Sequence, residues 1–303
     1  MQVSVTISGF TRLFDNDLSK VLDTARVIDD SGAHQLVLAD HVVMGPRTDR
    51  YPFGTFPYGA EEPWPEPITL LAAVAAVTAR VRLGTGILIT PLRPPALLAK
   101  TIATLDQISG GRVDLGVGTG WQREEYTANN IAWADRWRLL DDGLRACAAL
   151  WTQSPPVEFA SPTVNFGPTW CLPQPVQQVP GTGVPLWYGV AAEGPHIDRI
   201  AELGTGWLPI HTTPPEELRA GITALRAAVA AAGRDPNAFE VRAGAKIVAN
   251  ADGSVDIGAT TEANRWLSDA GVTSASVGTG RQVSDPAGLE RFLADAVTAF
   301  AAL

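Results

Sequence analysis

The sequence has 303 residues, and 46% of them are hydrophobic, which is enough to build a large buried core. The formal net charge is −9 and no basic run is present, which argues against nucleic acid or an anionic membrane surface as a partner. No basic segment with an apolar stretch opens the chain, and no apolar run reaches about 18 residues. We therefore expect a cytoplasmic protein without a signal peptide or a transmembrane helix.

In chain order, eight apolar or β-branched runs have the character of buried strands. They are residues 3–8, 35–41, 81–89, 113–117, 184–190, 206–210, 240–248 and 273–277. Amphipathic segments lie between them, with apolar residues at helical spacing such as Leu140, Leu144 and Trp151. Asp285-Pro286 is expected to begin the last helix. Eight strands alternating with helices predict a single-domain (β/α)8 TIM barrel over residues 1–303, ahead of a doubly wound sheet.

Two stretches exceed the length of a minimal barrel. Residues 43–65 are rich in Pro, Gly, Tyr and Phe, and residues 152–183 carry several prolines and aromatic side chains. Long structured loops near the carboxyl ends of strands usually shape a substrate pocket. We expect both insertions to cover the carboxyl-end face of the barrel, with ordinary packing loops as the alternative.

The residues at the strand ends exclude two kinds of chemistry. A metal-dependent barrel hydrolase usually needs a His-x-His pair with further ligands, but the four histidines show no ligand spacing. Cys147 and Cys171 do not form a metal or disulfide pattern either. No Gly-x-Ser-x-Gly motif is present, so a hydrolytic triad is not expected. We therefore predict no metal site.

Small residues mark two further strand ends. Gly116, Gly118 and Gly120 remove side chains where a flat ligand or another part of the backbone comes close, or where the chain turns tightly. The loop 189–194 precedes a helical pattern, and its backbone N–H groups are suited to a phosphate.

The second strand ends in Asp40-His41. His41 is a candidate proton donor or a hydrogen-bonding partner of the reacting centre, and the alternative is a structural histidine at a strand end. His211 has the same two interpretations. Trp64 and Trp121 are candidates for the wall of an apolar pocket.

The order of these pieces resembles the luciferase-like monooxygenase family of TIM barrels over nearly the whole chain. The resemblance includes Asp40-His41, Arg82-Leu83-Gly84-Thr85-Gly86, Ser109-Gly110-Gly111-Arg112, the segment from Leu115 to Trp121 with Glu124-Glu125, the stretch 173–187, and Gly204 to Pro209. The branch that uses the deazaflavin coenzyme F420, known from actinobacteria, is the most similar.

The resemblance implies a non-prolyl cis peptide bond at Gly86–Ile87 that presses against the cofactor ring. We expect His41 to be the catalytic residue, with Trp64, Trp121 and His211 in the substrate pocket. The expected cofactor-binding residues are Asp40, Thr85, Gly86, Ile87, Gly118, Thr119, Gly120, Glu124, Gly189, Val190, Ala191, Ala192, Glu193 and Gly194.

The chain departs from the F420-dependent sugar-phosphate dehydrogenases, which carry a catalytic Glu at the position of Trp121 and a Trp at the position of Met44. A sugar phosphate is therefore not the expected substrate. We expect F420-dependent hydride transfer with a small, fairly apolar organic molecule. Reduced FMN with oxygen, as in a monooxygenase, and a non-catalytic ligand-binding barrel remain the alternatives.

The F420 tail carries carboxylates and needs cationic neighbours, for which the sequence offers Arg47, Arg50, Arg93 and Arg199. Members of the family are often dimers, so the resemblance implies a homodimer as the expected assembly, by analogy alone.

Overall fold

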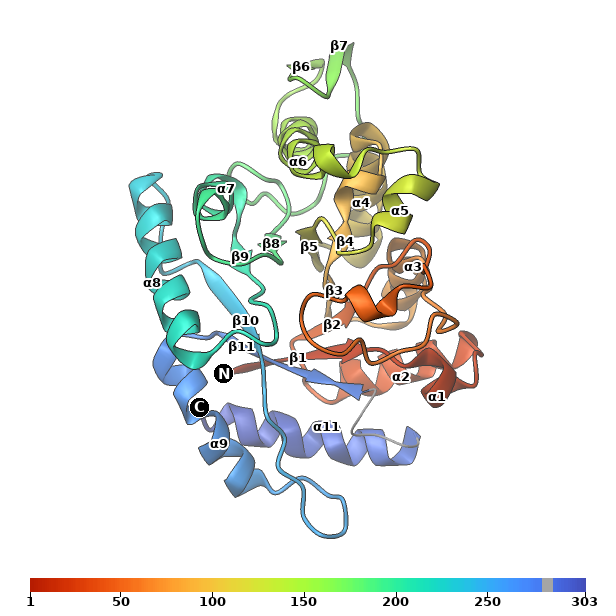
Figure 1. The fold of residues 1–303 in the computed structure, drawn as a ribbon, viewed down its shortest axis with the longest axis vertical. Coiled ribbons are helices and arrows are strands. Elements are labelled where there is room, and N and C mark those ends of the chain that lie inside the picture. The colour runs from red at the N-terminus through yellow and green to blue at the C-terminus, as the bar shows by residue number, and fades with distance from the viewer. Residues whose placement is uncertain (280–285) are drawn as a thin grey trace.

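The computed structural model describes residues 1–279 and 286–303. Its centre is a closed barrel of parallel strands, shown with its surrounding helices in Figure 1. The strands are β1 (Gln2–Ile7), β2 (Gln35–Leu38), β3 (Arg82–Thr85), β4 (Leu88–Ile89), β5 (Val113–Gly118), β8 (Leu186–Tyr188), β9 (Gly206–Trp207), β10 (Glu240–Gly244) and β11 (Ser274–Gly278). Around the barrel the order is β1, β2, β3, β5, β8, β9, β10 and β11, and β11 pairs with β1. The predicted (β/α)8 TIM barrel is confirmed.

Helices cover the outside of the barrel. They are α1 (Phe10–Phe14), α2 (Ser19–Asp30), α3 (Pro67–Val77), α4 (Pro95–Ser109), α5 (Arg123–Ala128), α6 (Arg136–Thr152), α7 (Pro195–Leu203), α8 (Pro215–Ala231), α9 (Ile257–Ala270) and α11 (Pro286–Ala301). The predicted start of the last helix includes Asp285, which lies outside the described residues. Every residue of β2 and β5 is buried, as expected for strands covered on both faces.

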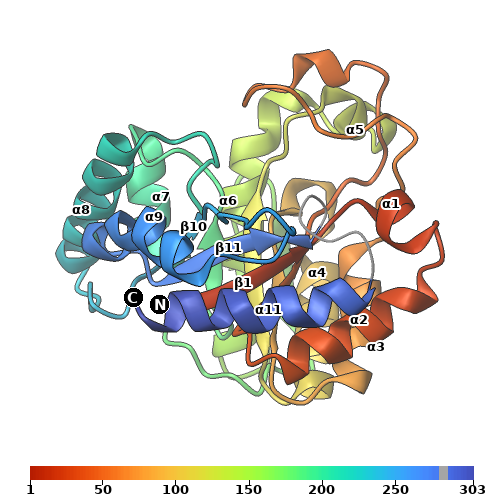
Figure 2. The ribbon, with the colours of Figure 1, turned by 90° about the horizontal axis from the view of Figure 1, so that it is seen from below.

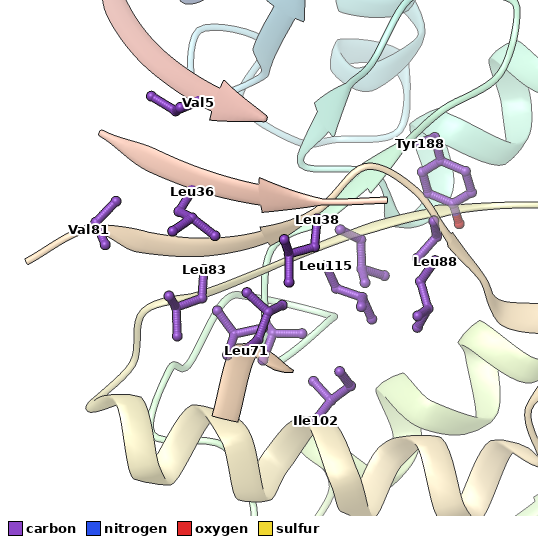
Figure 3. Close-up of a cluster of buried hydrophobic side chains, with 14 of the residues drawn as sticks. Val5, Leu36, Leu38, Leu71, Val81, Leu83, Leu88, Ile102, Leu115 and Tyr188 are labelled. Atoms are coloured by element: carbon purple, nitrogen blue, oxygen red, sulfur yellow. The ribbon is translucent and has the colours of Figure 1, made fainter. Parts of the chain in front are cut away.

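The core lies between the strands and the helices that cover them. In Figure 3, Leu36 of β2 and Leu83 of β3 lie near Leu71 of α3, and Ile102 of α4 lies below Leu115 of β5. These side chains belong to one large cluster of buried apolar residues that runs through the barrel. This packing fixes the strand ends that carry the candidate site.

The third barrel strand is divided into β3 and β4. The peptide bond between them, Gly86–Ile87, is cis, as the family resemblance implies. β3 pairs with β2 and β5, and β4 then pairs with β5 alone, through Leu88 opposite Val117. A short bulge therefore stands at the carboxyl-end face, between β3 and β4.

The first insertion lies where the sequence predicts it. Residues 43–65 follow β2 and pass beside α5, which follows β5, so both occupy the carboxyl-end face (Figure 2). The backbone N–H of Gly45 donates to Oε1 of Gln122, 2.7 Å away, and this contact ties the insertion to the start of α5. The short 3-10 helix Thr48–Arg50 lies within the insertion.

The prediction that residues 152–183 also cover the carboxyl-end face is wrong. α6 runs back from β5 to the amino-end face, and the insertion begins where α6 ends. There Gln177 donates through its backbone N–H to Oδ2 of Asp106 near the end of α4, and through Nε2 to the carbonyl of Val113, the first residue of β5. The insertion, with its hairpin of β6 (Val157–Ala160) and β7 (Asn165–Thr169), therefore lies away from the candidate site.

Among residues 1–279 and 286–303, none of the helices combines the length and the apolar character needed to cross a bilayer.

Candidate functional site

His41 lies on the carboxyl-end face, just beyond β2, and it is paired with a carboxylate from α5. Its Nδ1 lies 3.4 Å from Oε1 of Glu125; 9% of the His41 side chain is exposed, and the Glu125 side chain is fully buried. The same Oε1 accepts a hydrogen bond of 2.8 Å from the backbone N–H of Val42. Glu125 thus contacts both the imidazole and the chain that follows it.

Three aromatic rings also lie close to His41. The ring centroid of Trp64 lies 4.7 Å from that of His41, and those of Phe56 and Trp121 lie 6.0 and 6.1 Å away, all in edge-on arrangements. Tyr51 contacts the ring of Trp121 at 5.3 Å. Tyr51, Phe56, Trp64 and Trp121 therefore form an aromatic cluster around the imidazole of His41.

The structure brings together all the pocket residues that the sequence proposes. Trp64 and Trp121 contact His41, and His211 stacks on Tyr51 at 6.2 Å. Sequence reasoning did not single out Tyr51, Phe56 or Tyr58, which complete the cluster. All three belong to residues 43–65, whose richness in Tyr and Phe was the available signal.

Asp40 points away from His41, as adjacent residues of an extended chain do. Its Oδ2 accepts from the backbone N–H of Ile89 at 2.8 Å and from Nη1 of Arg93 at 2.7 Å, and its Oδ1 accepts from Nη2 of Arg93 at 3.1 Å. Only 1% of the Asp40 side chain is exposed. Asp40 therefore ties β4 to the end of β2, and both of its oxygens are engaged with the protein itself.

The glycines at the strand ends make room for the bulge. A Cβ on Gly118 would lie 3.0 Å from Cδ1 of Ile87, one on Gly189 would lie 2.3 Å from Cγ2 of Ile87, and one on Gly120 would meet Ile89 at 2.8 Å. The close approach predicted from these glycines is thus present. Its partners are the side chains of Ile87 and Ile89.

The remaining cofactor candidates near β5 have structural contacts. Thr85 donates through Oγ1 to the carbonyl of Gly116 at 2.7 Å, and the carbonyl of Thr119 accepts from the Tyr126 hydroxyl at 2.6 Å. Glu124 packs against Gly45, where a Cβ would lie 2.6 Å from Cγ of Glu124. Glu125, the next residue, is the one that contacts His41.

The loop 189–194 leads into α7 and leaves several donors available. Gly189 donates its N–H to the carbonyl of Val117, and the carbonyl of Val190 accepts from the Trp207 indole at 2.8 Å. Within the described residues, no protein acceptor pairs with the backbone N–H groups of residues 191–194. The loop is half-buried at Ala191 and Ala192 and exposed at Glu193 and Gly194.

A buried polar network fills the barrel under the bulge, and sequence reasoning did not identify it. Gln35 donates to Asp114 at 2.6 Å, Arg82 donates to Asp114 at 2.6 Å, and Arg242 donates to Gln35. Burial lowers the pKa of Arg242 to about 10. A Cβ on Gly86 would lie 2.9 Å from Nη2 of Arg242, so the guanidinium lies directly against the bulge.

A metal centre has no support in the part of the chain that the structure describes, because no cluster of three or more His, Cys, Asp and Glu side chains forms there. Cys147 and Cys171 are both buried free thiols. Burial raises the pKa of Cys147, so its thiol stays protonated at neutral pH.

Comparisons with known proteins identify the family and the fold of the chain. A family model described as luciferase-like monooxygenase matches residues 2–290. A protein of Mycobacterium tuberculosis, described as uncharacterized, is 37% identical over 171 residues, which cover 56% of this chain and 58% of that protein. The match thus spans less than two thirds of the length of that relative.

Two solved structures share the fold. The coenzyme F420-dependent tetrahydromethanopterin reductase from Methanopyrus kandleri has a TM-score of 0.71 and 18% identity, and the match covers 98% of both chains. The oxygenating constituent of 3,6-diketocamphane monooxygenase from Pseudomonas putida, in complex with FMN, has a TM-score of 0.76 and 14% identity over 98% of this chain and 97% of that one. At these identities the likeness concerns the fold alone. The family model, in contrast, spans nearly the whole sequence, and the chain belongs to the luciferase-like monooxygenase family.

Proposed function

We propose that this protein is an F420-dependent oxidoreductase that transfers a hydride between the cofactor and a small, fairly apolar organic substrate. The observation that carries the proposal is His41, held at the mouth of the barrel by Glu125 and flanked by aromatic rings. A hydride transfer to or from a carbonyl carbon needs a matching proton at the oxygen, and an imidazole such as that of His41 is suited to exchange a proton near neutral pH.

The residues of the site fit a phosphate-bearing cofactor. The backbone N–H groups of residues 191–194 have no hydrogen-bond acceptor among the described residues. These residues directly precede α7, and the N-terminus of a helix favours a bound anion. The bulge at Gly86–Ile87 stands beside this loop, because a Cβ on Gly189 would touch Ile87. When bound, F420 would supply the hydride chemistry, and the chain would supply position and electrostatics.

The chain's own part in the reaction follows from the contacts of His41. The imidazole holds or releases a proton at the ring nitrogen that faces away from Glu125. The rings of Phe56, Trp64 and Trp121 exclude water and favour an apolar substrate. The related sugar-phosphate dehydrogenases have a catalytic Glu at the position of Trp121, and the indole of Trp121 cannot donate a proton in its place. The proposal therefore assigns the role of proton donor to His41.

A second candidate is an FMN-dependent monooxygenase that uses reduced flavin and oxygen. The observation that favours it concerns the four arginines expected to bind the carboxylates of the F420 tail. Three of these arginines are already paired with carboxylates of the protein, so they are less available to an F420 tail. Arg47 pairs with Asp49, Arg93 with Asp40 and Glu66, and Arg199 with Asp141. FMN lacks the carboxylate-bearing tail and makes no such demand.

The test that separates these candidates is direct binding. Purified protein is titrated separately with F420 and with FMN, and the affinities are compared by fluorescence quenching. The proposal predicts tighter binding of F420, by at least about tenfold, or about 1.4 kcal/mol. Tighter binding of FMN would contradict the F420-dependent oxidoreductase and favour the FMN-dependent monooxygenase. Binding of either cofactor without turnover with any donor or acceptor would indicate a ligand-binding barrel.

The phosphate position gives a prediction of its own. Glu193 is exposed in the loop 189–194, so its carboxylate would repel a bound phosphate. Glu193→Gln and then Glu193→Lys should tighten cofactor binding stepwise, by at least about threefold for Lys at low ionic strength, and the gain should shrink as salt is added. The matched control is Glu262→Lys on α9, another exposed charge reversal, for which no change is expected. Equal affinities in all variants would place the phosphate elsewhere.

A further inference from the structure

Glu125 is an unusual buried carboxylate. Its side chain is fully buried, yet its only ion-pair contact among the described residues is with His41, and no Lys or Arg approaches it. Oε1 accepts from Val42 N–H, and Oε2 has no hydrogen-bond partner there. Other buried carboxylates of this chain are better compensated: Asp40 faces Arg93, and Asp114 faces Arg82. A buried carboxylate that lacks such partners is costly and needs a reason to be retained.

The imidazole nitrogen of His41 that lies nearest to Glu125 has no hydrogen-bond partner among the described residues. Nδ1 is buried and makes no hydrogen bond, and its nearest carboxylate atom is Oε1 of Glu125 at 3.4 Å. Catalytic hydrogen bonds are often long in the absence of ligand and shorten when the substrate binds. A neutral histidine carries its proton on either Nδ1 or Nε2, and a carboxylate beside Nδ1 favours the proton there.

We propose that Glu125 is a positioning residue that fixes the tautomer of His41. Nδ1–H donates to Oε1 of Glu125, which leaves the lone pair of Nε2 available. Nε2 accepts the hydroxyl proton of an alcohol substrate; in ketone reduction it first takes a proton from solvent and then donates it to the carbonyl oxygen. When Nε2 gains a proton, the positive charge of the ring is offset by the carboxylate, and no proton passes to Glu125. The catalytic consequence rests on the proposed function of His41, while the tautomer is a property of the free protein.

The competing role for Glu125 is purely structural, since Oε1 also holds the backbone N–H of Val42. Glu125→Gln separates the two roles. Glutamine keeps the length, the volume and an oxygen for Val42 N–H, but its neutral amide is a weaker acceptor for Nδ1–H. Asp142→Asn is the matched control, because Asp142 is also buried and accepts a loop N–H, from Thr163 on the distant hairpin side.

The first measurement is the tautomer of His41, read from nitrogen-15 chemical shifts of the imidazole in the full chain without cofactor. Only four histidines are present, so His41 is assigned by the signal lost in His41→Asn. We expect at least about 90% Nδ1–H tautomer in the wild type and in Asp142→Asn, a ratio near tenfold, and a clear loss of this preference in Glu125→Gln. A wild-type His41 that carries its proton on Nε2 overturns the proposal without any variant.

The second measurement is turnover of reduced F420 with a panel of apolar ketones. Glu125→Gln should lower kcat by about 10- to 100-fold with KM within a few-fold, the usual scale for partners that orient an active histidine. In the His41→Asn background the same change should cost less than about twofold, because Glu125 acts through His41. An equal loss in both backgrounds overturns the positioning role. If His41→Asn itself leaves turnover intact, the proposed function of His41 fails instead.

Discussion

Replacing His41 with Asn is expected to lower turnover at least about 100-fold while the fold and most of the cofactor affinity are kept. Asn fills a similar shape but exchanges no proton at neutral pH. The rings of Trp64 and Trp121 and the buried Glu125 all lie beside His41 and stay in place around a side chain of similar shape, so we expect the loss to come from chemistry and not from collapse of the site. The measurement is kcat with reduced F420 and an apolar ketone, beside cofactor affinity from fluorescence quenching.

His34→Asn is the control for this prediction. His34 precedes β2 at the amino-end face, where its backbone N–H donates to the carbonyl of Val3, and burial lowers its pKa. Its replacement should leave kcat within about twofold of wild type, since groups away from the reacting atoms contribute little to proton transfer. If His41→Asn retains turnover within a few-fold as well, His41 is a structural histidine, and His211 or Glu125 is the next candidate for the proton donor.

The strands of the barrel were predictable because their signal is local. A short run such as Leu36-Val37-Leu38 is apolar on both faces, which is typical of a strand covered on both sides. Their bounds were less predictable. Residues 206–210 predict a strand of five residues, but β9 comprises only Gly206 and Trp207. Hydrogen bonding at the barrel rim depends on the neighbouring strands, which a single run of sequence does not contain.

The error over residues 152–183 has a topological cause. The helical spacing of Leu140, Leu144 and Trp151 indicates a helix before the insertion, and a helix that follows a barrel strand returns the chain to the amino-end face. The aromatic composition of the insertion suggested a pocket loop, but its place in the chain decides the face. Residues 43–65 follow a strand directly and therefore lie at the mouth of the barrel.

The candidate site was predictable only in part. His41, Trp64, Trp121 and His211 could be chosen because strand ends meet at one face. The sequence could not decide whether Glu124 or Glu125 is the carboxylate that contacts His41. The two residues are adjacent, and their side chains point about 100° apart on a helix. The register of α5 places the second against His41, and in this register the buried Tyr126 packs against Trp133, with 4.9 Å between the ring centroids. No local pattern in the sequence records that contact.

Asp40→Asn is expected to lower the free energy of unfolding by about 3 kcal/mol in the absence of cofactor, because the exposed Glu66 is then the one carboxylate paired with the largely buried guanidinium of Arg93 among the described residues. The measurement is urea denaturation followed by circular dichroism. The double variant Asp40→Asn with Arg93→Met removes the stranded charge and should recover much of the loss. Asp49→Asn breaks the exposed pair with Arg47 and should cost less than about 1 kcal/mol.

This prediction separates two roles for Asp40. The family resemblance implies a contact with the cofactor, while the structure commits both carboxylate oxygens to Arg93 and the N–H of Ile89. If Asp40 acts by holding β4 and the adjoining bulge, stability falls first and cofactor affinity falls with it, and the double variant recovers both in part. An unchanged denaturation midpoint with a large loss of affinity would instead mean that Asp40 leaves Arg93 and binds the cofactor itself. The order of the two losses therefore distinguishes a residue that shapes the bulge from one that binds the ligand.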